Sequence, residues 1–159
     1  MAKFAGMTGA LLLGGVLATA VLAESHIDPA AQKAIDARQS HMTLYSFNLG
    51  TLGGMAQDKI PYDATMADAA AKNLAALAGI DQMGYWVEGT DAETIEGSKA
   101  KAEIWADMAD FESKEMALAE ASTALAEVAG TDLDSLKAAF GDVGKACGTC
   151  HETYRVSDD

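Results

Sequence analysis

The strongest chemical signal in the sequence lies near its C-terminus, where two cysteines and a histidine fall within five residues. Cys147 and Cys150 are separated by two residues, and His151 follows directly. Two thiols at this spacing can each add to one vinyl group of a porphyrin, and the adjacent imidazole can then bind the iron. The pattern therefore predicts one haem c, covalently attached through both cysteines, with His151 as an iron ligand.

Three other uses of a CxxC pair fit the sequence less well. A thioredoxin-like redox motif lies between a strand and a helix, whereas this pair falls late in a predicted helix. A structural zinc site needs about four ligands, and beyond His151 the chain offers only His26 and His41, without a second CxxC. A plain disulfide would not need the histidine. We therefore expect both cysteines in thioether bonds and no disulfide.

The N-terminal segment has the pattern of an export signal. Lys3 precedes an apolar run over about residues 7–22, and no acidic residue occurs before Glu24. We predict a cleaved signal peptide over residues 1–23 and a single domain over residues 24–159. A permanent membrane anchor is the alternative, but the run is short and interrupted by glycines. The predicted location is the periplasm, and no later segment is predicted to insert into a membrane.

The charge balance narrows the set of partners. The chain has 11 Lys and Arg against 24 Asp and Glu, a formal net charge of −13 at pH 7. Nucleic acids and anionic membranes bind clustered cations, so neither is an expected partner. An acidic surface favours a partner protein with a basic patch. Because no serine or cysteine nucleophile pairs with a histidine, we predict a carrier and not an enzyme.

Apolar residues recur at intervals of three and four residues in four segments, which is the period of amphipathic helices. The first predicted helix begins at Asp28, and Asp63 caps the second. The third is predicted over residues 99–129, and Asp132 caps the fourth, which carries the cysteines. A loop of about twenty residues, 79–98, joins the second and third. The sequence predicts an all-α fold, an antiparallel four-helix bundle with haem near one end.

Four segments resemble the cytochrome c′ family, in the same order along the chain: ARQSHMTLYSFNLGTLGGMA, IPYDA, AEIWADMADFE and LKAAFGDVGKACGTCHETYR. Together they span nearly the whole chain after the predicted signal peptide. The resemblance implies a four-helix bundle, often a homodimer, with haem between the helices near one end. This fold agrees with the bundle that the helical spacing predicts.

The resemblance also bears on the sixth coordination position of the iron. Many members of the family leave it open beneath an apolar residue of the first helix, and the matching residue of the RQSHM segment is Met42. The resemblance implies the low-spin branch, in which a methionine at this position is the sixth ligand. Two alternatives stay open. His41 is a rival ligand, although it lies about 100° around the helix, and Met42 can be ordinary core packing beside a five-coordinate iron.

Four further side chains have predicted roles. The resemblance implies that Arg38 binds a haem propionate; the alternative is an ion pair with Asp36 on the surface. Arg155 shares a helix face with His151; the resemblance implies a basic residue beside the proximal histidine here, and the alternative is a cation interacting with the helix dipole. Two aromatic residues are expected to wall the haem, or to be ordinary core: Trp105 and Phe140.

The coordination of the iron decides between the predicted functions. With His151 and Met42 on the iron, the methionine raises the reduction potential relative to a nitrogen ligand, and the six-coordinate site changes little on reduction. This favours a carrier of single electrons between redox partner proteins. An open iron favours binding of NO or CO, as gas binding or as protection against nitrosative stress. A third alternative is a haem subunit of a larger complex.

Overall fold

The computed structural model describes residues 27–157, so the predicted signal peptide lies outside the described residues. Four long helices make up most of this part of the chain, and it contains no strand. The elements, in chain order, are α1 (Pro29–Ala56), α2 (Ala64–Ala78), the 3₁₀ turn η1 (Met83–Tyr85), the short α3 (Glu103–Ala106), α4 (Met108–Val128) and α5 (Leu133–Tyr154).

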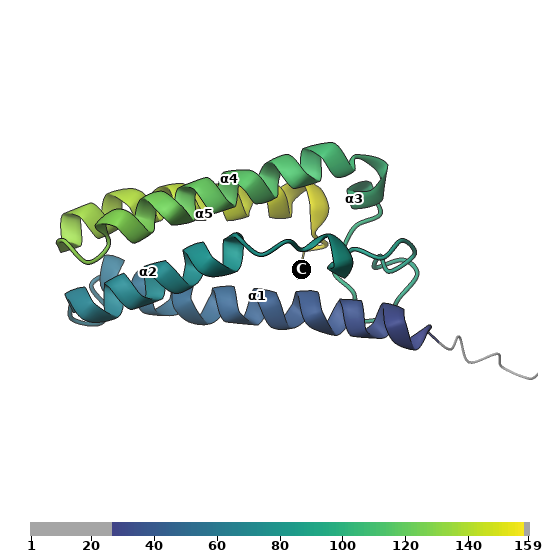
Figure 1. Cartoon of the computed structure of the whole chain (residues 1–159), viewed down its shortest axis with the longest axis horizontal. Helices are drawn as coiled ribbons and strands as arrows, with labels where there is room; N and C mark the ends of the chain where they lie inside the picture. Colours follow the sequence, from purple (N-terminus) through teal and green to yellow (C-terminus); the bar gives the residue numbers. More distant parts are fainter. Residues whose placement is uncertain (1–26, 158–159) are drawn as a thin grey trace, which may run out of the picture.

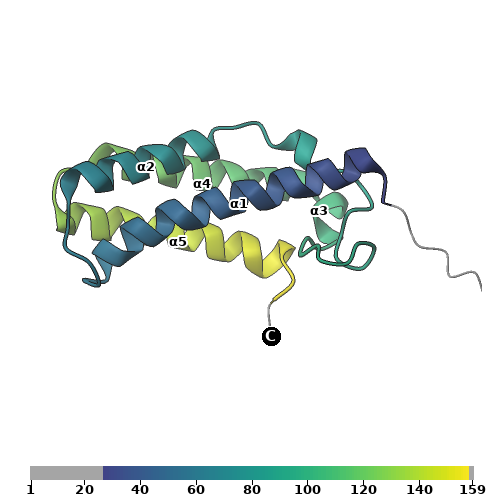
Figure 2. The ribbon, with the colours of Figure 1, turned by 90° about the horizontal axis from the view of Figure 1, so that it is seen from below.

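The four long helices form an antiparallel bundle, as the sequence predicts. Successive long helices run in opposite directions, and α2 packs on α1 and on α4, while α5 packs on α4 and closes the ring against α1 (Figures 1 and 2). The connection from α2 to α4, with η1 and α3, lies at the end of the bundle where α1 begins (Figure 1). None of the helices described here combines the length and apolarity needed to cross a bilayer.

Three aspartates begin the helices as predicted. Asp28, Asp63 and Asp132 each accept a hydrogen bond from a backbone N–H two or three residues further on, at 3.1, 2.9 and 2.8 Å. These bonds satisfy N–H groups that have no partner inside the helix. Gly79 caps the end of α2, as expected. The local signals therefore predict both ends of α2 and the starts of α1 and α5.

The single helix predicted over residues 99–129 is wrong in its first part. The helix is interrupted at Asp107, whose backbone is non-helical (φ −140°, ψ 68°). Its side chain accepts a hydrogen bond from the N–H of Asp110 at 3.1 Å, so it acts as the N-cap of α4. Before the interruption only the one turn of α3 is helical, and Ala100 pairs as an isolated bridge with Arg155.

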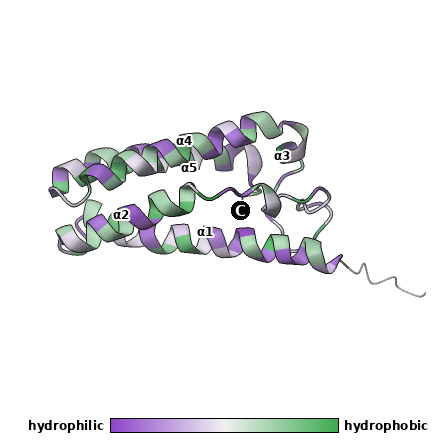
Figure 3. Cartoon of the chain, viewed as in Figure 1, coloured by the Kyte–Doolittle hydropathy of each residue, from purple (hydrophilic) through white to green (hydrophobic). Residues whose placement is uncertain are grey.

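Two hydrophobic clusters hold the bundle together. Hydrophilic and hydrophobic residues are interspersed along each long helix (Figure 3), and the buried side chains of all four helices meet in the interior. The larger cluster joins all four long helices, and its fully buried members include Leu52, Leu74, Leu125 and Leu136. The smaller cluster lies at the α3 end and contains Ala100, Ile104, Phe111 and Tyr154.

Gly130 allows α2 and α4 to approach closely at the other end of the bundle. A Cβ atom at this position would lie 2.9 Å from the Cβ of Asp68 and 3.2 Å from the carbonyl oxygen of Ala64. Both contacts are shorter than ordinary van der Waals separation, and one of them is to backbone. The glycine after α4 therefore does more than end that helix, because it also sets the distance to the start of α2.

Candidate functional site

A cavity of about 660 Å³ lies between α1, α4 and α5, on the side where α1 and α5 face each other. This volume is within the range of about 300–1,000 Å³ that is typical of ligand pockets. Its walls come from both hydrophobic clusters, with Tyr45 and Leu49 from the larger and Ile104 and Phe111 from the smaller. The break before α4 contributes to the site, since Ile104 before it and Phe111 after it pack in the same smaller cluster and both line the cavity.

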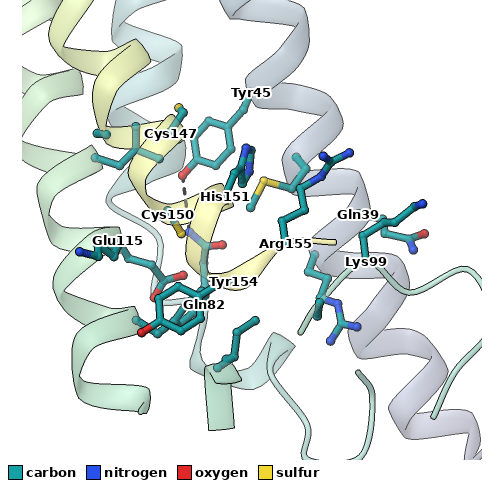
Figure 4. Close-up of a pocket in the computed structure, with 18 of the residues that line it drawn as sticks. Gln39, Tyr45, Gln82, Lys99, Glu115, Cys147, Cys150, His151, Tyr154 and Arg155 are labelled. Carbon is teal, nitrogen blue, oxygen red and sulfur yellow. Dashed lines mark hydrogen bonds between the residues drawn. The ribbon is translucent and has the colours of Figure 1, made fainter. Parts of the chain in front are cut away.

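The predicted haem-attachment residues all line this cavity. Cys147, Cys150 and His151 lie three and four residues apart on α5, a spacing that brings them to one face of a helix (Figure 4). Both side chains are half-buried. Burial raises the pKa of both, that of Cys150 to about 11 with a further contribution from the charge of Glu115. The cysteines are thus uncharged at neutral pH and positioned toward the cavity.

The imidazole of His151 is in the form that can bind a metal. Burial, and then the positive charge of Arg155, lower its pKa below the ordinary value of 6.5. A neutral imidazole is the form that ligates iron. Arg155 follows α5 directly and also lines the cavity. Arg155 is thus close enough to act on His151, and its role beside the proximal histidine stays a prediction.

The opposite wall comes from α1, where Met42 and His41 point in different directions. Met42 lines the cavity and is 39% exposed. His41 is 4% exposed and is not among the lining residues, because its ring packs against Tyr45 and Tyr85 at centroid distances of 4.7 and 5.9 Å. The rival ligand thus faces away from the site, as its position on the helix predicts.

Arg38 lines the cavity, and its terminal nitrogens bind the long connection between α2 and α4. Nη1 donates to Oγ1 of Thr90 at 2.8 Å, and Nη2 donates to the Thr90 carbonyl at 2.6 Å and to Oγ of Ser98 at 2.9 Å. The guanidinium also lies 5.2 Å from the ring centroid of Trp86. The alternative of an ion pair with Asp36 is not formed. The contact with a propionate stays a prediction.

The two aromatic residues predicted to wall the haem do not line the cavity. The indole N–H of Trp105 donates to the Trp86 carbonyl at 2.9 Å, and its ring packs in the smaller cluster. Phe140 lies seven residues before Cys147, which is about 10 Å along α5, and it packs over Gly53. Its position among the regularly spaced apolar residues of α5 correctly predicts that it faces the bundle interior. This spacing does not show at which point along the helix the cavity lies.

Other residues form the walls in their place. The rings of Trp86 and Phe111 meet edge to face at 4.7 Å and both line the cavity. Phe111 belongs to the predicted core stripe, so the sequence contains a signal for it, whereas Trp86 lies in an irregular segment. Gln82 and Glu115 are among the polar lining residues that are absent from the predicted site. Burial raises the pKa of Glu115 to about 7.

The charged side chains around the cavity are mainly positive, whereas the whole chain is negatively charged. Four cationic side chains line it, Arg38, Lys99, Lys114 and Arg155, against one carboxylate, that of Glu115. Such a lining suits a ligand with an apolar body and anionic groups, as a porphyrin with two propionates is. No group of three or more His, Cys, Asp or Glu within residues 27–157 could hold a metal by itself. These residues fit haem and define a c-type haem protein built on a four-helix bundle.

Comparison with known proteins identifies the family. The profile of the family described as cytochrome c′ matches residues 33–155, and the chain belongs to this family. It is 43% identical to cytochrome c-554 and 39% identical to cytochrome c′, both of Cereibacter sphaeroides, over 80% and 79% of this chain and 83% and 85% of theirs. A solved structure of cytochrome c′ from Rhodobacter sphaeroides is similar with a TM-score of 0.78 and 38% identity, covering 80% of this chain and 98% of that one.

Family membership establishes the cofactor. Members of this family carry covalent haem c, and they are typically periplasmic c-type cytochromes. The chain therefore carries haem c, and Cys147 and Cys150 are its two cysteines. Haem c supplies an iron that exchanges one electron and can bind diatomic gases. The residues of this chain decide which of these two properties is used.

Proposed function

We propose that the protein carries single electrons through a haem c whose iron is bound by His151 and Met42. The observation that supports this most directly is the position of Met42. It lines the same cavity as His151, but from α1 and not from α5, so both side chains are available to a group held in this cavity. Its sulfur is a soft neutral donor of the kind that binds haem iron in electron carriers.

Two properties of the site suit electron transfer. A thioether stabilises reduced iron and raises the potential relative to a nitrogen ligand. The apolar walls formed by Phe111, Ile104 and Leu49 lower the polarity around the iron, which also limits the reorganisation that accompanies a change of charge. The electron donor and acceptor are partner proteins that approach an acidic surface.

The proposal is tested by replacing the ligand while keeping its volume and hydrophobicity. Purified wild-type protein is expected to show low-spin ferric absorption with the weak far-red band of a methionine–iron bond. Met42→Leu should lose this band and become high-spin. Met116→Leu is the matched control, because Met116 is an exposed methionine on α4 outside the cavity, and its spectrum should match the wild type.

Two results would contradict this ligand assignment. A wild-type protein that is high-spin in the ferric state would mean that the sixth position is open. A Met42→Leu variant that keeps the low-spin spectrum would mean that another side chain binds the iron. In the second case a variant of His41 would be the next to examine.

Binding of NO or CO is the second candidate function, and the exposure of Met42 favours it. The side chain belongs to neither hydrophobic cluster, so little packing opposes its displacement from the iron. The nitric oxide complex of a variant of cytochrome c′ from Alcaligenes xylosoxidans is a similar structure, with a TM-score of 0.70 and 34% identity. If gas binding is the function, CO should bind the reduced wild type as fast as it binds reduced Met42→Leu.

We propose that the chain is exported and cleaved after residue 23, as the sequence of the N-terminal segment predicts. Family members are typically periplasmic, which supports export. Mass spectrometry of the protein purified from a periplasmic extract should give a mature N-terminus at Glu24. An uncleaved N-terminus would contradict the proposal.

We also propose a homodimer in which α1 contributes to the interface. Leu44 and Phe47, one turn apart on α1, are 50% and 73% exposed, which is unusual for large apolar side chains. Ligand-controlled dimer dissociation is a described property of a similar cytochrome c′ structure. Light scattering should give a dimer for the wild type and a monomer for Phe47→Glu. A monomeric wild type at all concentrations would contradict this.

A further inference from the structure

One wall of the haem cavity carries a carboxyl group that no cation pairs with. Glu115 comes from α4, and it is the only carboxylate among the residues that line the cavity (Figure 4). Its charge contributes to the raised pKa of Cys150, so the carboxyl lies close to a residue that holds the haem. Lys114 also lines the cavity, but its ammonium group lies 3.7 Å from the carboxylate of Asp110.

Two buried polar groups on the same cavity wall have no hydrogen-bond partner. Gln82 is 6% exposed, and its Oε1 is a buried acceptor without a donor. The indole N–H of Trp86 is a buried donor without an acceptor in good hydrogen-bond geometry, although it acts on Glu115 and lowers its pKa. A carboxylate can only accept hydrogen bonds, whereas a carboxylic acid both donates and accepts. The Oε1 of Gln82 needs a hydrogen-bond donor, which the protonated form of Glu115 provides and its carboxylate does not, whereas the Trp86 N–H can donate to either form.

The surroundings of Glu115 favour its neutral form. Burial is the largest cause of its raised pKa of about 7, and the negative charges of Glu112 on α4 and Asp81 before η1 add to it. No lysine or arginine is among the side chains that contribute to this pKa. The other titratable and charged side chains that line the cavity are Lys114 of α4, described above, and the following residues of α1, of the connection before α3 and of the C-terminal part of the chain: Arg38, Tyr45, Lys99, Cys147, Cys150, His151, Tyr154 and Arg155.

We propose that Glu115 is a redox-linked proton site, which binds a proton from solvent when the haem iron accepts an electron. A redox partner protein supplies the electron, iron(III) becomes iron(II), and one O–H bond forms on the Glu115 carboxylate, so the charge inside the cavity does not change. On oxidation the electron leaves to the partner and the proton returns to solvent. The inference rests on the proposed function in one respect, because it requires an iron that alternates between iron(III) and iron(II).

The physical basis is the low dielectric of the cavity. An added electron at the iron disfavours a nearby negative charge, and this repulsion is screened far less inside the protein than in water. Reduction therefore raises the affinity of Glu115 for a proton. By linkage, protonation of Glu115 makes reduction easier by the same free energy.

The test measures the reduction potential of the holoprotein from about pH 5 to about pH 9. For the wild type we expect the potential to fall as pH rises through the neutral range, with a slope approaching about 59 mV for each tenfold change in proton concentration. E115Q keeps the shape of the side chain without its ionisation, so its potential should stay near the acidic limit of the wild type. E120Q is the matched control, since Glu120 is exposed on α4 outside the haem cavity, and it should keep the wild-type slope.

A second measurement identifies the proton-binding group directly. The infrared difference spectrum between the reduced and oxidised protein should contain a carboxylic acid C=O band that shifts in D₂O and is missing in E115Q. A flat wild-type potential, or an E115Q variant that keeps the slope and the band, would overturn the inference. Failure of the proposed function is a different result, because it is seen in the spin state of the wild type and of Met42→Leu.

Discussion

Arg38 and Thr90 lie 52 residues apart in the chain and are joined by two hydrogen bonds, from Nη1 to the hydroxyl at 2.8 Å and from Nη2 to the carbonyl at 2.6 Å. Arg38 as a whole is 5% exposed. Burying a cation is costly unless its donors are paired, so these bonds fix the irregular connection against α1. This connection carries Gln82 and Trp86, and the pair thus positions one wall of the haem cavity.

Replacing Arg38 by lysine should loosen this connection. A lysine keeps the charge but cannot make the forked contacts of a guanidinium. We expect Arg38→Lys to lower the free energy of unfolding by about 1–3 kcal/mol and to speed amide exchange over residues 87–98 more than in α2. Lys33→Ala, at an exposed position of α1, is the control and should change stability by less than about 0.5 kcal/mol. Unchanged exchange over 87–98 would show that Arg38 does not hold the segment.

Covalent attachment of the haem should be lost only when both cysteines are replaced. Cys147→Ala or Cys150→Ala leaves one thioether, so each single variant should retain haem after denaturation. The double variant should release it, because no other cysteine exists in the chain. The intact mass under denaturing conditions checks both outcomes. Haem that stays bound to the denatured double variant would contradict attachment through these residues.

Replacing glycine by alanine should lower the unfolding free energy at Gly130 and raise it at Gly141. Gly130→Ala places a methyl group 2.9 Å from the Cβ of Asp68, and we expect a loss of about 1–3 kcal/mol in unfolding free energy. Gly141→Ala in α5 meets no atom within 4 Å, and should gain about 0.5–1 kcal/mol because alanine favours the helix. Urea unfolding measures both, and equal effects would mean that α2 and α4 can separate at Gly130 without cost.

Stability should depend on pH through Glu115. Its pKa in the folded protein is about 7, above the ordinary value of 4.5, so the folded state binds the proton more tightly than the unfolded state. Stability is therefore unaffected below about pH 4.5 and decreases as pH rises toward about 7. Because the side chain is partly exposed, we expect E115Q to gain about 1–2 kcal/mol over the wild type at about pH 8 and nothing at about pH 4. A difference that does not depend on pH would mean that Glu115 is not protonated in the folded state.

The fold could be predicted because its signals are local. The three-and-four spacing of apolar residues and the aspartate caps at Asp28, Asp63 and Asp132 each act within one or two helical turns. The break at Asp107 is also marked by a local signal, since an aspartate can cap a helix. The apolar spacing continues through this residue, however, and therefore predicts one uninterrupted helix. The same periodicity identified Phe140 as buried but could not give its distance from Cys147.

The candidate site was only partly predictable for a different reason. Cys147, Cys150 and His151 follow from a motif, Met42 follows from the family resemblance, and the structure brings them to one cavity. The partners of Arg38 lie in a connection without periodicity, so no pattern in the sequence could indicate them. Gln82 and Trp86 belong to the same connection and reach the cavity only through tertiary contacts.

The proton NMR spectrum of the reduced wild-type protein tests the central proposal most directly. If Met42 binds the iron, its methyl group lies over the haem ring, and the ring current should move one methionine methyl signal far upfield of all others. That signal should be present in Met116→Leu and absent in Met42→Leu. A reduced wild-type protein without an upfield methionine methyl signal would contradict the proposal that Met42 completes the site.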